Sequence, residues 1–170
     1  MTETDRQPSE GKPWYGRRGE LLVVLQFIIL FGFILAPAWS PLAHSELFAA
    51  LAPLRWGVLI PLWGAAVAFG VLGALHLREY ITPLPYPVAH NRLVRGGVYA
   101  VVRHPLYSSQ LFAALGWVLF SLSLPHLAIL VVGFLFFDFK ASREEEWLQS
   151  RHPEYAEYAQ KVRKFIPWLY

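Results

Sequence analysis

The sequence predicts an all-α integral membrane protein, and two observations carry this prediction. Hydrophobic residues make up 55% of the 170 residues and charged residues only 16%, whereas soluble domains carry about 25% charged residues. The apolar residues are also gathered into four runs, at 21–39, 54–77, 106–124 and 127–139. A soluble domain of this size has too high a surface-to-volume ratio to bury so much apolar surface, and the composition is far from that of a disordered chain.

The first half of the chain reads as a tail and two membrane spans. Residues 1–19 are polar and of mixed charge, which predicts a cytoplasmic N-terminal tail followed by a single membrane domain at 20–170. The run at 21–39 contains one polar side chain, Gln26. At about 1.5 Å per residue it is long enough to cross a hydrocarbon core of about 30 Å. The run at 54–77 is rich in Gly and Ala, which predicts close packing against another helix.

The second half alternates polar and apolar segments. Residues 78–103 form a long polar segment rich in Pro, Asn and Gly, and a third span follows at 106–124. Pro125-His126 predicts a tight reversal before the fourth run at 127–139. That run is too short to span unless it is tilted, partly re-entrant, or continued as helix through Lys140 and the glutamates after it. Residues 141–165 are amphipathic, and we expect Pro153 to divide them into two helices and Pro167 to end the second.

Charge and cysteine content set the orientation and exclude several classes of site. With four spans and both termini in the cytoplasm, fourteen of the 15 Lys and Arg residues lie inside and only Arg55 lies outside, as the positive-inside rule requires. This predicts an inner (cytoplasmic) membrane protein. The basic residues form no stripe suited to nucleic acid. The chain has no cysteine and no metal-ligand spacing, so we expect no metal site. The sequence leaves the oligomeric state undecided, although the second span, at 54–77, could pack against a copy of itself.

Two polar segments on the cytoplasmic side supply the candidate functional residues. Pro105 suits the first turn of a helix, which would put Arg103 and His104 at a helix N-terminus where an anion is favoured. The alternative is a plain membrane entry point at which Arg103 reaches the lipid headgroups. Three glutamates, residues 144–146, span about 200° of a helix and cannot all face one point. Their alternative interpretation is a solvated helix start.

The order of these blocks is more specific than any one of them. Leu93-Val94, Gly97-x-Tyr99, Arg103-His104-Pro105-x-Tyr107, an apolar hairpin, Glu144-Glu145, Tyr155-x-x-Tyr158 and Ile166-Pro167 follow one another with characteristic spacing. Over roughly residues 83–167, which would form the catalytic half, this resembles the isoprenylcysteine carboxyl methyltransferase family and its relatives, the phospholipid N-methyltransferases.

The resemblance implies an S-adenosylmethionine-dependent methyltransferase whose C-terminal helices help form the cofactor pocket. By the same resemblance, the cofactor-binding residues would be Tyr99, Arg103, His104, Pro105, Tyr107, Glu144 and Glu145, with His104, Arg103 and Glu145 as the catalytic candidates. A helix N-terminus with Arg103 suits the cofactor's carboxylate, and carboxylates suit its ribose hydroxyls or ammonium. The family's pair of glutamates could correspond to residues 144 and 145 or, shifted by one residue, to 145 and 146. The acceptor would be a small or lipid-like molecule: an isoprenylcysteine-like carboxylate, a phospholipid amine or a thiol.

Two other functions fit parts of the sequence. Membrane reductases of the sterol-reductase type, which use NADPH, resemble the same C-terminal half. A haem-carrying or accessory membrane protein is the non-enzymatic alternative, because histidines occur on both predicted sides of the bundle: His44 and His126 on one, and His76, His90 and His104 on the other.

Overall fold

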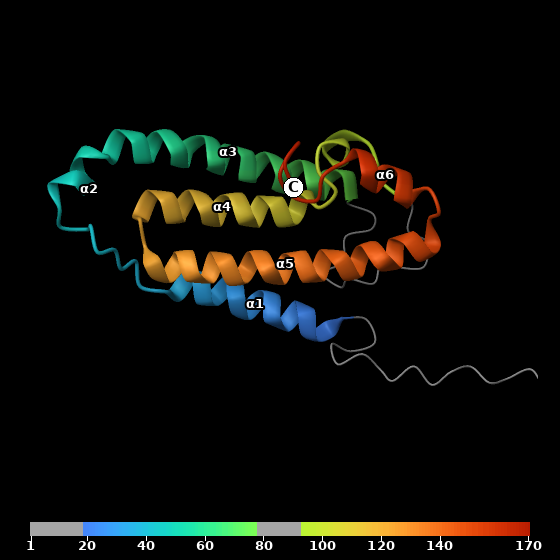
Figure 1. The fold of residues 1–170 in the computed structure, drawn as a ribbon, viewed down its shortest axis with the longest axis horizontal. Coiled ribbons are helices and arrows are strands. Elements are labelled where there is room, and N and C mark those ends of the chain that lie inside the picture. The colour runs from blue at the N-terminus through green and yellow to red at the C-terminus, as the bar shows by residue number, and fades with distance from the viewer. Residues whose placement is uncertain (1–18, 78–92) are drawn as a thin grey trace, which may run out of the picture.

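The computed structural model describes residues 19–77 and 93–170, and every helix or strand assigned within these residues is a helix (Figure 1). This confirms the predicted all-α class. The predicted tail up to residue 18 and most of the predicted polar segment (78–92) lie outside the described residues. In chain order the described elements are α1 (Glu20–Leu35), α2 (Glu46–Ala50), α3 (Ala52–Leu77), the 3₁₀ helix η1 (Gly97–Ala100), α4 (Pro105–Ser121), α5 (Leu124–Arg151) and α6 (Tyr155–Lys161).

Two of the described helices are long and apolar enough to cross a membrane. They are α3, with 26 residues, and α5, with 28 residues. The apolar helices α1 and α4 are shorter, at 16 and 17 residues. Large apolar side chains stay exposed along the bundle, including Leu35 (78%), Val67 (65%) and Leu135 (62%). An apolar surface of this extent is unusual in soluble monomers and indicates a membrane protein.

The long helices lie side by side, with α4 packed against α3 and α5, and α1 packed against α5 (Figure 1). Small residues of α3 face α4, as the sequence predicted. A Cβ on Gly73 would lie 3.2 Å from the Pro105 ring, and one on Gly70 would lie 2.9 Å from Ser109 Oγ. These glycines let α3 approach the first turns of α4, where the candidate residues lie.

The fourth apolar run is part of one continuous helix. Of the three alternatives for residues 127–139, continuation through Lys140 and the glutamates is correct, because α5 runs unbroken from Leu124 to Arg151. It extends past the start of α4 toward α6 (Figure 1). The prediction of a reversal at Pro125-His126 is wrong. The chain reverses at Leu122, whose φ is 49°, and Ser123, and Pro125 lies in the first turn of α5, where proline is favoured.

The C-terminal segment departs from the predicted second helix. The break at Pro153 is confirmed, since α5 ends at Arg151 and α6 begins at Tyr155. The predicted end at Pro167 is wrong, because α6 ends at Lys161 and the chain then runs extended beside the residues before α4. There Arg103 N–H donates to Arg163 O (2.8 Å) and His104 N–H to Lys164 O (3.1 Å). This pairing closes the C-terminal segment over the start of α4.

Candidate functional site

Most of the site residues predicted from the sequence meet at the α6 end of the bundle. His104 is the N-cap of α4 and Pro105 is its first residue, as the sequence indicated. Arg103, His104 and Tyr107 come from this helix start, and Glu144 and Glu145 come from the second half of α5. These five residues are called the carboxylate cluster below. It joins positions about forty residues apart in the chain.

Glu145 lies at the centre of the cluster. Arg103 donates to it through two nitrogens, Nε to Oε1 at 2.9 Å and Nη2 to Oε2 at 3.2 Å. His104 Nε2 lies 2.8 Å from the same Oε1. The three side chains are only 8–14% exposed. A two-pronged guanidinium–carboxylate contact of this kind fixes geometry as well as charge.

Glu144 contacts the other side of the imidazole. Its Oε2 lies 3.4 Å from His104 Nδ1, and its Oε1 accepts a hydrogen bond from the Tyr107 hydroxyl. Glu146, one residue on, points elsewhere: it is 63% exposed and pairs with Arg143 at 2.8 Å. The structure therefore brings Glu144 and Glu145 to His104 and leaves Glu146 outside. That these two carboxylates contact the cofactor stays a prediction.

Arg103 also holds the C-terminal segment. Its Nη1 donates to the carbonyls of Ala159 at 2.9 Å and Val162 at 2.5 Å, at the end of α6. A guanidinium has five N–H donors, and these two bonds together with the pair to Glu145 use four of them. Arg103 thus ties α4, α5 and α6 together. Its predicted contact with a ligand carboxylate remains untested.

Tyr99 lies beside the cluster rather than in it. It is buried in η1, and its carbonyl accepts from the Tyr158 hydroxyl of α6 at 2.5 Å. Burial, and then the charge of Glu144, raise the pKa of Tyr99 to about 12. The phenol therefore stays neutral at physiological pH.

His104 experiences two opposing effects. Burial alone lowers the pKa of an imidazole, but hydrogen bonds to Glu144 and Glu145 and the charges of both carboxylates outweigh burial, so the pKa of His104 is raised above 6.5. Both ring nitrogens face a carboxylate oxygen, which favours the imidazolium with a proton on each nitrogen.

Aromatic rings form the wall between the cluster and the apolar bundle. The rings of His104 and Tyr107 stack with centroids 5.6 Å apart, and Tyr107 stacks on Phe137 of α5 at 4.9 Å. Phe165 of the C-terminal segment closes against both His104 and Tyr107. The cluster is therefore bounded by aromatic faces on its membrane side.

Sequence reasoning missed three residues at this site as candidates. Tyr155 is 1% exposed, and its hydroxyl has no hydrogen-bond partner among the described residues. Burial, and then the charge of Glu145, raise its pKa. Lys140 is 1% exposed, beside the Tyr107 ring. Asp138 accepts from Lys164 Nζ at 2.6 Å and from the Tyr170 hydroxyl at 2.9 Å. Tyr155 belonged to a motif already noted, whereas nothing in the local sequence marked Lys140 as buried or Asp138 as the partner of Lys164 and Tyr170.

A family comparison agrees with this geometry. The fold and the cluster define a helical membrane protein with a polar site at one end of its bundle. Residues 55–155 match the model of the phospholipid methyltransferase family. The matched region spans α3 to the start of α6 and holds all five cluster residues. The chain belongs to this family, which confirms the resemblance noted from the sequence.

Several curated proteins are similar to this chain. The cobalt-zinc-cadmium resistance protein CzcN of Cupriavidus metallidurans is 34% identical over 113 residues, which cover 66% of this chain and 50% of that protein. Protein-S-isoprenylcysteine O-methyltransferase B of Arabidopsis thaliana is 37% identical over 82 residues, covering 47% and 42%. A probable protein-S-isoprenylcysteine O-methyltransferase of Oryza sativa subsp. indica is 29% identical over 167 residues, covering 92% and 85%. The chain thus spans about half the length of the first two relatives.

Proposed function

We propose that the protein is an S-adenosylmethionine-dependent methyltransferase that acts in the membrane on a small or lipid-like acceptor. The observation that carries this proposal is the carboxylate cluster: two largely buried glutamates held at an imidazole and a guanidinium, in a chain that belongs to a methyltransferase family. The methyl group would be accepted by a carboxylate, by a phospholipid amine or by a thiol.

The chemistry of the residues fits this cofactor. S-adenosylmethionine supplies an electrophilic methyl group on a sulfonium cation, and it carries an ammonium and ribose hydroxyls. Glu144 and Glu145 provide carboxylate oxygens for cationic or hydroxyl groups, and the rings of Tyr107 and Tyr99 suit a cation at close range. Tyr155 is buried close to Arg103 and Glu145, which adds a further polar group to the same end of the bundle.

The cluster residues divide the work. Arg103 keeps Glu145 and α6 in place as a positioning residue, and His104 holds the two carboxylates at a fixed separation. Because methyl transfer is a displacement in line with the breaking bond, correct positioning supplies much of the acceleration. A carboxylate acceptor needs no base. An amine or thiol must lose a proton, and one of the glutamates is then the candidate base, because His104 already carries a proton on each ring nitrogen.

The proposed membrane arrangement has four spans, formed by α1, α3, α4 and α5, in the inner membrane with both termini in the cytoplasm. The Lys and Arg distribution supports it, since among the described residues Arg55 alone falls at the α2 end while the basic residues from Arg95 onward fall at the other. At about 1.5 Å per residue, the 16 residues of α1 measure about 24 Å. That length suffices when flanking residues reach the interface.

Calorimetry with S-adenosylhomocysteine tests the proposal on the full chain in detergent micelles. We expect saturable binding, and we expect His104→Ala to lose it while the far-ultraviolet circular dichroism spectrum stays helical. Membranes that contain the protein should also transfer labelled methyl groups from S-adenosylmethionine into a lipid or thiol extract. Binding of NADPH instead of S-adenosylhomocysteine, or a Soret band in the purified protein, would contradict the proposal and support the reductase or haem alternatives.

A further inference from the structure

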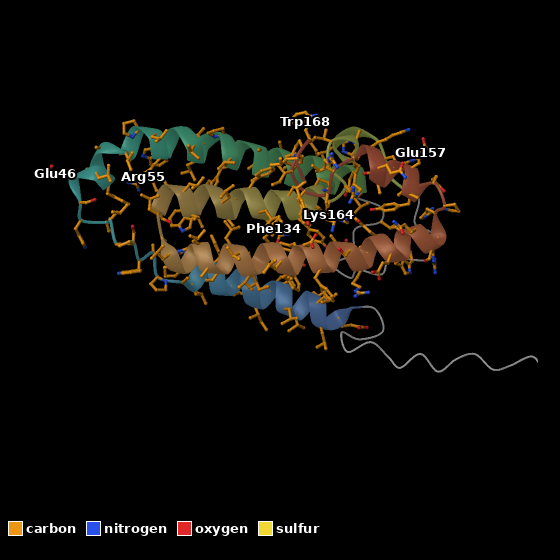
Figure 2. The ribbon with its side chains drawn as sticks, viewed as in Figure 1. Glu46, Arg55, Phe134, Glu157, Lys164 and Trp168 are labelled. Atoms are coloured by element: carbon orange, nitrogen blue, oxygen red, sulfur yellow. The ribbon has the colours of Figure 1, made fainter. Side chains whose placement is uncertain are left out.

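A turn beyond α6 presents two large apolar side chains to the outside. The N–H groups of Leu169 and Tyr170 donate to Ile166 O, at 3.1 and 3.0 Å, and those of Phe165 and Ile166 donate to Tyr170 O, at 2.8 and 2.7 Å. Within this turn, Trp168 is 89% exposed and Leu169 is 76% exposed. Figure 2 shows Trp168 at the upper edge of the molecule. The pair Trp168-Leu169 is called the tip below.

The tip contains a backbone conformation that tryptophan rarely adopts. The φ of Trp168 is 62°, in the left-handed region, where a residue with a Cβ is strained and glycine or asparagine is favoured. Because the ring is exposed, packing within the chain does not explain why a large aromatic residue stands there. Residues held in such conformations cluster at functional positions, so we looked for a partner outside the chain.

Contacts with α5 place the turn at the level where the apolar part of this helix ends. The Tyr170 hydroxyl donates to Asp138 Oδ1 at 2.9 Å, and Lys164 Nζ donates to the same atom at 2.6 Å. Asp138 is next to the end of the apolar run 127–139, and Leu135, three residues earlier, is 62% exposed. In the proposed membrane arrangement this level is the boundary between hydrocarbon and lipid headgroups, where tryptophan and tyrosine are enriched.

The surface beside the turn is apolar and faces outward. A cavity of about 280 Å³ lies between α4, α5 and residues 165–166. Its wall includes Val131 and Leu135 of α5, which are 52% and 62% exposed, so the cavity lies on the outer face of the bundle. The tip follows directly after residues 165–166, at the headgroup edge of this lipid-facing surface.

The residues just before the tip are bonded to the candidate site. Backbone hydrogen bonds tie them to the residues before α4, and Ser108 Oγ donates to Phe165 O at 2.7 Å. The Phe165 ring is buried and lies against the rings of His104 and Tyr107. Only two residues separate Phe165 from Trp168. A displacement of the tip is therefore transmitted to the aromatic wall of the carboxylate cluster.

We propose that the tip inserts into the headgroup region of the phospholipid bilayer, and that this contact holds the residues before it in place over the carboxylate cluster. The indole of Trp168 has an apolar body and an N–H donor, which suits the boundary between hydrocarbon and headgroups, and Leu169 adds an apolar side chain. The lipid contact is independent of any cofactor, whereas its effect on the cluster rests on the proposed function.

Nitroxide labelling measures the depth of the tip, because the chain has no cysteine and a single introduced cysteine takes the only label. The full chain with Leu169→Cys is labelled and reconstituted into vesicles of phosphatidylcholine and phosphatidylglycerol in equal parts. Paramagnetic resonance then reads collisions of the label with oxygen, which concentrates in hydrocarbon, and with a water-soluble nickel chelate.

Two further labelled positions set the scale. Glu157→Cys, at a side chain 69% exposed on α6, is the reference for water, and Leu135→Cys is the reference for hydrocarbon. We expect the label at position 169 to lie between them, with less access to nickel than the label at 157 and less access to oxygen than the label at 135. Equal access to nickel at 169 and 157 overturns the proposal.

Variants of Trp168 test the effect on the cluster, by calorimetry with S-adenosylhomocysteine in nanodiscs of the same lipids. Trp168→Asn removes the ring but tolerates the left-handed backbone, and it should weaken binding about fivefold or more, the lower range of couplings between sites. Trp168→Phe keeps an apolar ring and should bind like the wild type. Trp39→Asn removes a tryptophan 57% exposed at the α2 end and should leave the affinity unchanged. Undiminished binding in Trp168→Asn overturns the coupling, and Leu169→Ser replaces that variant if it does not fold.

A reciprocal measurement separates lipid contact from a role confined to the shape of the turn. If lipid contact favours binding at the cluster, binding at the cluster must favour lipid contact to the same extent. Saturating S-adenosylhomocysteine should therefore lower the access of nickel to the label at position 169 and leave the label at 157 unchanged. Unchanged access at 169 overturns the coupling.

The two proposals fail separately. A protein whose label at position 169 lies in lipid but that binds no S-adenosylhomocysteine would overturn the proposed function and leave the lipid contact of the tip standing. A protein that binds S-adenosylhomocysteine while the tip lies in water would overturn only the inference about the tip.

Discussion

The two ends of the bundle use the same residue types for different purposes. Arg55 lies at the α2 end (Figure 2). It donates to the carbonyls of Phe120 at 2.5 Å and Phe48 at 3.1 Å, and its guanidinium lies over the Phe48 ring. At the α6 end, Arg103 also donates to two carbonyls, but it adds a two-pronged contact to Glu145. Both arginines close helix ends. The described residues place a carboxylate only at Arg103.

The two buried histidines differ in the same way. His126 near the α2 end lies 2.8 Å from the Ser123 hydroxyl and packs edge-on against the Phe33 ring. His104 lies between two carboxylates. A hydroxyl and a ring satisfy a neutral imidazole, whereas two carboxylates stabilise its charged form. A polar residue that only joins two helices needs hydrogen-bond donors and acceptors around it, as His126 has. The candidate site differs in that several charged side chains are gathered around His104.

The largest expected difference between the two ends is in stability. Arg103→Ala removes one partner of a buried ion pair and should lower the free energy of unfolding by about 3–5 kcal/mol. Arg55→Ala removes hydrogen bonds to carbonyls and should cost about 1–3 kcal/mol. Unfolding by sodium dodecyl sulfate titration in mixed micelles measures both. Arg103→Lys, which keeps the charge without the fork, should be intermediate, and equal losses at the two arginines would contradict the comparison.

Ligand binding should separate neighbouring glutamates on α5. Glu144→Gln removes a buried charge from the cluster and should weaken S-adenosylhomocysteine binding by about tenfold to a hundredfold, given about 1.5–3 kcal/mol for a charged hydrogen bond. Glu146→Gln is the matched control, because its carboxylate is exposed and pairs only with Arg143 in the described structure. Calorimetry should find its affinity unchanged. Equal weakening in both variants would show that overall charge, and not the cluster, governs binding.

The part of the site that could be predicted from the sequence is the part carried by local motifs. Pro105 marked the helix start, and the spacing of Arg103, His104 and Tyr107 places all three side chains within its first turn and the residues before it. The pair Glu144-Glu145 followed from the family resemblance. That these blocks face each other is a long-range result, yet the predicted placement of both polar segments on one side of the membrane already implied that they share one end of the bundle.

The rest depended on partners far away in the chain. Lys140 is buried because Gln26, 114 residues earlier, lies beside it, and no local pattern encodes that contact. The end of α6 at Lys161 is set by pairing of Arg163 with Val102, which overrides the helical periodicity. The continuity of α5 was ambiguous because hydropathy falls where the apolar run ends, whereas the Glu- and Arg-rich sequence beyond it has high helix propensity.

The histidines predict a difference in pH dependence. The pKa of His104 is raised in the folded protein above its unfolded value of about 6.5. Its contribution to stability is therefore fully present below pH about 6.5 and is lost as pH rises through the folded pKa. Each unit of difference is worth about 1.4 kcal/mol. The unfolding midpoint of the wild type should fall over this range, and that of His104→Gln should not.

His126→Gln is the control for this titration. Its imidazole contacts a serine hydroxyl and aromatic rings in the described structure, so the variant should keep the fall in midpoint that His104 causes. If the unfolding midpoint of the wild type stayed constant between about pH 6 and about pH 9, the range in which a histidine ordinarily titrates or titrates after a raised pKa, the two carboxylates would not be holding the proton on His104.

Two glycines of α3 give the smallest expected difference between the ends. Gly73 lies at the α6 end, where an added Cβ would meet the Pro105 ring at 3.2 Å and Leu106 Cδ2 at 3.2 Å, whereas Gly57 at the α2 end has open space around it. Because the proline ring is held at the start of α4, Gly73→Ala should cost about 1 kcal/mol through overpacking. Gly57→Ala should gain about 0.5–1 kcal/mol from helix propensity. The same detergent titration measures both, and Gly73→Ala should also weaken S-adenosylhomocysteine binding, since it displaces the turn that carries His104. A stabilising Gly73→Ala with unchanged binding would show that the position of this turn relative to α3 does not control the cluster.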